Sequence, residues 1–166
     1  TARVGDTIKI DAGTFSETVV INRNNITLLG KDSVSTTIAP GAGNIGIFAD
    51  TQSGLQIRDL AVTGGSNGIK FISVSNSKII GDSVGAASGI GIFLLHDCDS
   101  NTVKSNQVGS NLTGIEIQGD NLGSGALAGN NNTIDKNWVT GSVQYGISVI
   151  YNAANNIVRD NTVQNN

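Results

Sequence analysis

The sequence predicts an all-β solenoid, in which the chain winds into stacked coils of short strands. Two repeated patterns lead to this prediction. The pattern N-x-[IV]-x-x-N-x-V recurs along the chain, and a Gly-Ile pair that opens an alternating apolar segment recurs between its copies. Successive pairs, which begin at Gly46, Gly68, Gly91, Gly114 and Gly146, lie 22, 23, 23 and 32 residues apart. Such a period is typical of solenoids, in which one repeat cannot bury its apolar face alone.

The composition favours strands and tight corners over helices. Gly accounts for 22 of the 166 residues and Pro for only 1, while Asn, Ile, Val and Thr are abundant. Gly and Asn adopt the left-handed conformations of tight turns, and β-branched residues favour strands. The length suits one domain, so we expect residues 1–166 to form a single unit.

Charge, hydropathy and cysteine content exclude several classes of function. The net charge is -3 and the cations are scattered, which gives no footprint for nucleic acid. The longest apolar run, "GIGIFLL", is far shorter than the roughly 20 residues that cross a bilayer, so we expect no membrane span. The single Cys98 cannot form an internal disulfide or a multi-cysteine zinc site.

The repeats assign the strands in chain order. Copies of the eight-residue pattern are "LQIRDLAV" from Leu55, "SKIIGDSV" from Ser77, "NTVKSNQV" from Asn101, "NTIDKNWV" from Asn132 and "NIVRDNTV" from Asn156. Apolar residues are spaced by two, so each coil holds two or three short strands. This predicts a parallel β-helix of about seven coils with two internal files of like residues: Ile69, Ile92, Ile115 and Ile147, and Val84, Val108, Val139 and Val163.

Asparagine recurs where the chain must turn between strands. Asn106, Asn137 and Asn161 share one position of the repeat, and Asp82 occupies it in an earlier copy. A side-chain amide at such a corner can bond the backbone of its own coil and the amide of the next coil. We therefore expect an asparagine ladder along one corner of the solenoid.

These repeats resemble the right-handed parallel β-helix superfamily, which includes pectate lyases, polygalacturonases and carbohydrate-binding and sugar-hydrolase domains. Residues 4–21, "VGDTIKIDAGTFSETVVI", and 25–38, "NITLLGKDSVSTTI", are similar to the first coils of such proteins. The resemblance implies right-handed coils and a carbohydrate-related role outside the cell or on its surface. The catalytic motifs of polygalacturonases, pectate lyases and pectinesterases have no counterpart in the sequence, and the scaffold also serves as an inert stalk, so no activity is transferred.

Candidate site residues lie on the outer surface of the Gly-Ile strands and at the corner that follows them. The outward positions are Lys70, Phe93, Glu116 and Ser148, and the corner carries Ser73, His96, Gly119 and Tyr151, with Asp97, Asp99 and Asp120 beside it. Acids on adjacent coils suit either glycoside hydrolysis or calcium binding. The candidates are Asp97, Glu116 and His96 for catalysis, and Lys70, Phe93, Asp99, Asp120 and Tyr151 for ligand binding.

Plainer interpretations stay open for the same residues. Asp97 and Asp99 fall where a later coil has Asn152 and Ala154, as expected of solvated turn residues, and His96 can be a surface residue beside them. Trp138 points outward by the alternation, where it stacks on a sugar ring, is a chance exposed aromatic, or packs laterally against a loop.

Two departures from the regular repeat bear on function. The coil between Gly114 and Gly146 is about nine residues longer, and the surplus falls within 118–131, a loop that either covers a ligand or is a harmless insertion. "TARV" stands where related chains have a capping helix, and "NTVQNN" stops within a coil, so we expect a fragment of a longer chain or coils that self-associate through uncapped ends.

Two hypotheses about function follow. The first is a carbohydrate-binding or polysaccharide-processing module, which as an enzyme would be a polysaccharide lyase or a glycoside hydrolase. Its ligand is expected along the outer Gly-Ile face under the 118–131 loop. The second is a non-catalytic structural or adhesive spacer in a larger surface protein.

Overall fold

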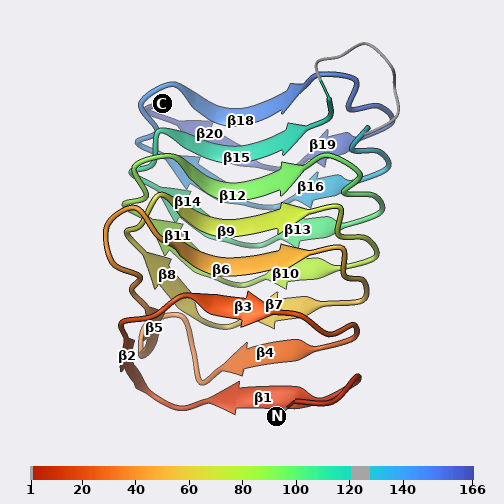
Figure 1. Cartoon of the computed structure of the whole chain (residues 1–166). Helices are drawn as coiled ribbons and strands as arrows, with labels where there is room; N and C mark the ends of the chain where they lie inside the picture. The colour runs from red at the N-terminus through yellow and green to blue at the C-terminus, as the bar shows by residue number, and fades with distance from the viewer. Residues whose placement is uncertain (1, 121–127) are drawn as a thin grey trace.

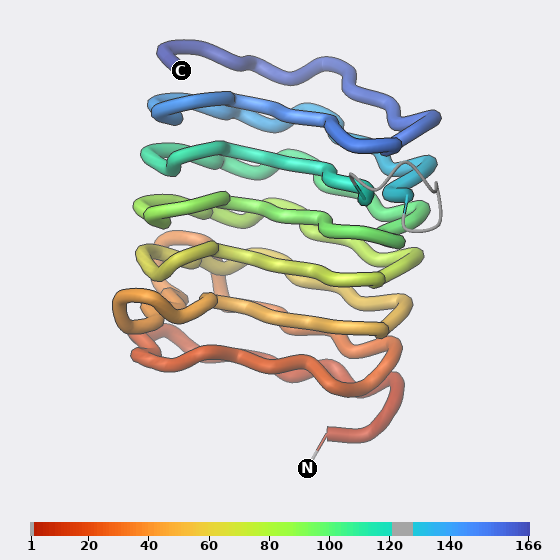
Figure 2. Tube along the Cα trace, turned by 45° about the horizontal axis from the view of Figure 1, so that its top comes forward, coloured from red at the N-terminus to blue at the C-terminus, as the bar shows by residue number. Residues whose placement is uncertain are grey.

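A computed structural model describes residues 2–120 and 128–166 of the chain. These residues form a solenoid of three parallel sheets and contain no helix. Six complete coils of three strands each are followed by two further strands, close to the expected seven coils. The first and last coils lie at opposite ends of the stack (Figure 1), and Figure 2 shows the coils lying almost level above one another. No helix in this part of the chain is long and apolar enough to cross a membrane.

Each sheet takes one strand from every coil that contributes to it. The first sheet contains β1 (Thr7–Ile10), β4 (Thr27–Gly30), β7 (Gln56–Arg58), β10 (Lys78–Ile80), β13 (Thr102–Lys104), β16 (Thr133–Asp135) and β19 (Ile157–Arg159). The second contains β2 (Gly13–Phe15), β5 (Thr36–Ile38), β8 (Ala61–Thr63), β11 (Ser83–Gly85), β14 (Gln107–Gly109), β17 (Trp138–Thr140) and β20 (Thr162–Gln164). The third contains β3 (Val19–Ile21), β6 (Ile45–Asp50), β9 (Asn67–Ile72), β12 (Ile90–Leu95), β15 (Thr113–Gln118) and β18 (Tyr145–Ile150).

The core consists largely of like residues stacked on like, as predicted, although Ile147 is only partly buried and Val163 is 48% exposed. In the third sheet Ile69 pairs with Ile92, Ile92 with Ile115, and Ile115 with Ile147. In the second sheet the register joins Val84, Val108, Val139 and Val163. Strands whose register slipped by one residue would turn these files toward solvent, so burial of the files fixes the register.

Glycines before the isoleucines are required by the stacking itself. A Cβ built on Gly91 would lie 2.7 Å from the carbonyl oxygen of Gly114 and 2.9 Å from Cγ1 of Val108. The same relation joins Gly68 to Gly91 and Gly114 to Gly146, again through the carbonyl oxygen of the next coil. A side chain at this position would therefore push neighbouring coils apart.

The corner asparagines form the predicted ladder, with bonds that run between coils. Asn137 Oδ1 accepts a hydrogen bond of 3.0 Å from the backbone nitrogen of Asn106, and its Nδ2 donates to the Val103 carbonyl and to Asn161 Oδ1, each at 2.9 Å. The side chain of Asn137 thus bonds backbone groups of the preceding coil. From the sequence, bonds to the backbone of its own coil were expected instead. Backbone groups that the bend leaves unpaired are satisfied in this way.

A second ladder, which the sequence analysis did not predict, uses the first asparagine of the repeat. The backbone nitrogens of Ser77, Asn101 and Asn132 donate to the side-chain oxygens of Asn101, Asn132 and Asn156 respectively, at 2.8–2.9 Å. Both asparagines of the N-x-[IV]-x-x-N pattern therefore have the same structural function.

Candidate functional site

The candidate site lies on the outer face of the third sheet, where one file of side chains crosses the coils. Phe93 pairs with Lys70 on one side and with Glu116 on the other, and Glu116 pairs with Ser148. The Lys70 ammonium lies 5.4 Å from the centroid of the Phe93 ring, within the range of a cation–π contact. A cation, an aromatic ring, a carboxyl and a hydroxyl thus stand in one row on successive coils.

Glu116 is the most buried ionisable group of this row. The residue is only 8% exposed, and burial raises the pKa of its carboxyl, an effect that a hydrogen bond with Ser148 partly offsets. A carboxyl in such surroundings retains its proton to higher pH than a solvated one. In its protonated form Glu116 can donate a hydrogen bond, or a proton, to an oxygen of a ligand lying on this face.

His96 and Tyr151 lie at the corner that follows this sheet. The backbone nitrogen of Ser73 donates to Leu95, that of His96 to Gln118, and that of Gly119 to Ile150, so the corner keeps its register from coil to coil. Thr51, Ser73, His96 and Tyr151 have φ values of 49–57°, in the left-handed region. His96 thus shares its backbone conformation with a threonine, a serine and a tyrosine, so its place is set by the turn.

Two of the predicted acids are engaged in the turn structure. Asp99 Oδ1 accepts a hydrogen bond of 2.6 Å from the backbone nitrogen of Asn130. Asp120 is 4% exposed, and its Oδ1 and carbonyl oxygen accept hydrogen bonds from Asn152 Nδ2 at 3.3 and 3.0 Å. Asp99 is thus a half-buried, hydrogen-bonded turn residue, whereas the plainer interpretation expected a solvated one.

The register separates the predicted residues into two groups. Glu116 pairs with Phe93 in the register of the third sheet, and His96 follows Phe93 by three residues in the same coil. At about 3.3 Å per residue the two backbone positions are about 10 Å apart along the strand direction. Lys70, Phe93 and Glu116 form the group on the sheet, whereas His96, Asp97, Asp99, Asp120 and Tyr151 form the group at the corner. Residues 121–127, the middle of the loop expected to cover the ligand, lie outside the described residues.

In the described part of the corner, acidic, histidine and cysteine side chains do not gather into a metal site. Within residues 2–120 and 128–166, no three such side chains are placed to hold a metal ion together. Cys98 is buried, and burial raises the pKa of its thiol to about 11. Neither observation provides a set of calcium ligands.

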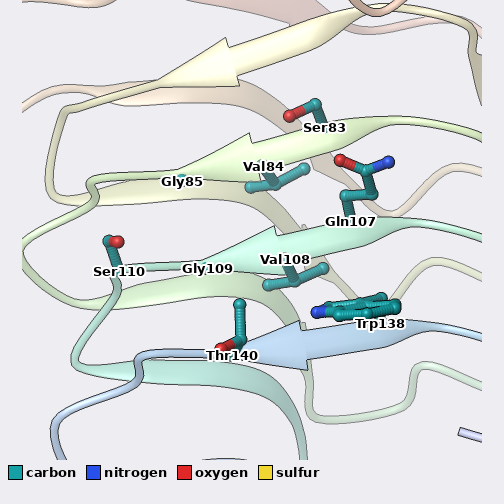
Figure 3. Close-up of a pocket in the computed structure, with 9 residues that line it drawn as sticks. All are labelled: Ser83, Val84, Gly85, Gln107, Val108, Gly109, Ser110, Trp138 and Thr140. Atoms are coloured by element: carbon teal, nitrogen blue, oxygen red, sulfur yellow. The ribbon is translucent and has the colours of Figure 1, made fainter. Parts of the chain in front are cut away.

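A groove on another face was not predicted from the sequence, which singled out only Trp138 among its outward-facing residues. It has a volume of about 440 Å³ and lies on the outer face of the second sheet, over β11, β14 and β17 (Figure 3). Its nine lining residues are Ser83, Val84, Gly85, Gln107, Val108, Gly109, Ser110, Trp138 and Thr140. The sequence feature that could have indicated the groove is a glycine in two successive copies, "SVG" and "QVG", where the neighbouring copies have threonine, "AVT" and "WVT". These two glycines pair in space and leave a hollow beside the tryptophan.

Comparisons with known proteins agree with this architecture. The family model described as "Right handed beta helix region" matches residues 5–166. An alginate lyase from a Paenibacillus species superposes with a TM-score of 0.80 at 17% identity, over 96% of this chain and 60% of the lyase. The ORF18 protein of Geobacillus virus E2 superposes with a TM-score of 0.76 at 15% identity, over 93% of this chain and 34% of the viral protein.

The chain thus spans less than two thirds of the length of either solved structure. None of the curated proteins matches it. At these identities the two superpositions establish a shared fold and leave the reaction open.

Proposed function

Because the chain belongs to the right-handed β-helix family, we propose that it is a polysaccharide-binding module of an exported or cell-surface protein. The observation that carries the proposal is the row of Lys70, Phe93, Glu116 and Ser148 on the outer face of the third sheet. Likeness in fold to an alginate lyase supports a polysaccharide as the class of ligand.

The row offers the groups that a sugar chain requires. Phe93 is only 8% exposed, and its ring supports the Lys70 ammonium that lies over it. That ammonium can pair with a carboxylate of an acidic sugar. Glu116, which burial biases toward its protonated form, can donate to a hydroxyl or ring oxygen. Since coils repeat about every 4.8 Å, a chain lying along the solenoid axis would meet these groups in turn.

Binding is favoured over processing by the corner geometry. Asp99 and Asp120 already accept hydrogen bonds from Asn130 and Asn152, and His96 stands about 10 Å along the coil from the level of Glu116. Burial nevertheless raises the pKa of the Glu116 carboxyl, which is the direction that a general acid requires. A lyase or hydrolase activity is therefore the second candidate, with Glu116 as its proton donor.

Titration calorimetry with acidic and neutral oligosaccharides tests the proposal. Lys70→Ala and Phe93→Ala should each weaken binding, by roughly tenfold if the contact contributes about 1.4 kcal/mol. Lys78→Ala removes an exposed lysine from the first sheet and serves as the matched control. Equal affinities for Lys70→Ala and Lys78→Ala, or no binding of any glycan at millimolar concentration, would favour the spacer hypothesis.

Turnover is tested on the same panel. If Glu116 donates a proton, shortened products should appear with the native chain and disappear with Glu116→Gln, which keeps the shape of the side chain but cannot titrate. Binding without products in both proteins would leave the module non-catalytic.

A further inference from the structure

The groove on the second sheet has an architecture of its own. Two outward files bound it, Ser83–Gln107–Trp138 on one side and Gly85–Gly109–Thr140 on the other. Val84 and Val108 between them are 1% exposed, because their side chains point into the core. The hollow is therefore floored by the backbone at Gly85 and Gly109 and walled by Trp138 (Figure 3).

The walls carry groups suited to sugar hydroxyls. Trp138 is 52% exposed, and Figure 3 shows its indole edge-on, with the ring nitrogen on the side of Thr140. Indole N–H, the Gln107 amide and the hydroxyls of Ser83, Ser110 and Thr140 supply both donors and acceptors. In the described part of the chain, no hydrogen bond joins the side chains of Gln107, Trp138 or Thr140 to another protein group.

The charge of the lining selects among sugars. None of its nine residues is ionisable at neutral pH. A carboxylate or sulfate brought into the groove would lose hydration without meeting a cation, whereas a neutral ring would lose little. This distinguishes the groove from the row on the third sheet, which includes the Lys70 ammonium.

We propose that this groove is a second glycan site, which binds an uncharged sugar by stacking one ring on Trp138 and bonding its hydroxyls to Gln107 and Thr140. The site lies on a different sheet from Lys70, Phe93 and Glu116. It therefore does not depend on the binding proposed for that face.

Tryptophan fluorescence tests the groove directly, because Trp138 is the one tryptophan in the sequence. Titration of the whole chain with neutral tetrasaccharides of glucose, xylose and mannose should shift or quench its emission in a saturable way for at least one of them. Tetrasaccharides of uronic acids should need at least about tenfold higher concentrations to produce the same change in emission, since their carboxylates gain no ion pair in the groove.

Variants distinguish the groove from the row on the third sheet. By calorimetry, Trp138→Ala should weaken neutral-sugar binding by roughly tenfold or more, as expected of a stacking platform, and Gln107→Ala should weaken it less. Tyr145→Ala removes an aromatic that is 60% exposed on the third sheet and should change nothing. Lys70→Ala should likewise leave the fluorescence response intact.

Three results would overturn the inference. They are a flat fluorescence titration with all neutral sugars at about 10 mM, a response to uronic acids as strong as to neutral sugars, or an equal loss of binding in Trp138→Ala and Tyr145→Ala. A flat fluorescence titration together with Lys70-dependent binding would reject the groove alone and leave the proposed function standing.

Discussion

Nδ2 of Asn106 donates a hydrogen bond of 3.0 Å to Oδ1 of Asn137 in the next coil. Both side chains are 1% exposed, so their amide groups have no access to water. Each amide also bonds backbone groups of the coils beside it, as Asn106 does with the Ile79 carbonyl. The corner of the solenoid is thus held by a continuous chain of amides whose members depend on one another.

Replacing Asn137 by Ala should destabilise the fold strongly. The backbone nitrogen of Asn106 and the carbonyl of Val103 would lose their partners, at a cost of about 1–3 kcal/mol for each buried group left unpaired. Lys136→Ala, at the exposed neighbouring position, should change the free energy of unfolding by less than about 0.5 kcal/mol. Urea denaturation measures both, and equal midpoints would show that the ladder adds no stability.

Asp82 should make stability fall as pH rises. It occupies the ladder position, where its Oδ1 accepts from the backbone nitrogen of Leu60 at 3.0 Å and its Oδ2 has no hydrogen-bond partner within the described residues. Burial raises the pKa of this carboxyl to about 8, whereas the unfolded value is about 3.9. The folded state holds the extra proton between these values, so its contribution is complete below pH ~4 and is lost as pH rises toward about 8.

Asp82→Asn provides the test of that pH dependence. The asparagine should donate to the Ile57 carbonyl, as Asn106 does to Ile79 in the next coil. The variant should be more stable than the native chain near pH 8, by an amount on the order of a few kcal/mol, and its stability should vary less between pH 5 and 8. Asp160→Asn, at an exposed position, is the control. A native chain whose unfolding free energy stays constant from pH 5 to 8 would contradict the assignment.

Lys104 should hold the charge of Asp135. Its ammonium lies 3.1 Å from Asp135 Oδ2, and Arg159 Nε lies 3.3 Å from Oδ1. Burial alone would raise the pKa of Asp135, but the hydrogen bond and charge of Lys104, with the charge of Arg159, bring it below its ordinary value. This contribution to stability is present at neutral pH and is lost as pH falls below ~4.

Arg159 Nε also donates a hydrogen bond of 3.3 Å to Asp135 Oδ1. We nevertheless expect Lys104→Ala to raise the pKa of Asp135 more than Arg159→Ala does, because Lys104 lowers this pKa more strongly than Arg159 does. Nuclear magnetic resonance titration of the carboxyl carbon measures this pKa in each variant. A pKa that is unchanged by Lys104→Ala would show that the ion pair does not persist in solution.

Gly91→Ala should separate adjacent coils. The added Cβ would meet the Gly114 carbonyl oxygen at 2.7 Å, a contact that requires the backbone to move. Overpacking of this kind costs about 1–3 kcal/mol, and thermal unfolding should reveal it as a lower midpoint. Val143→Ala changes a side chain that is 78% exposed and should have little effect. A native midpoint for Gly91→Ala would mean that the coils can shift without cost.

The sequence by itself determined the architecture, because the fold repeats a local pattern. Inward alternation and a nearly constant period placed Ile92 on Ile115 and Asn106 beside Asn137, since stacked repeats bring equivalent residues together. The outward direction of Phe93 and Glu116 followed from the same alternation.

Only the tertiary structure decided how groups from different coils meet, because burial and distance depend on all neighbours at once. It showed that position 91 must lack a side chain because the carbonyl oxygen of Gly114 lies against it, and that Asp99 accepts a hydrogen bond from the backbone nitrogen of Asn130. It also paired Gly85 with Gly109 to open the groove beside Trp138. A hollow is made by side chains that are missing on adjacent coils, and residues 24 positions apart in the chain become neighbours only when the coils stack.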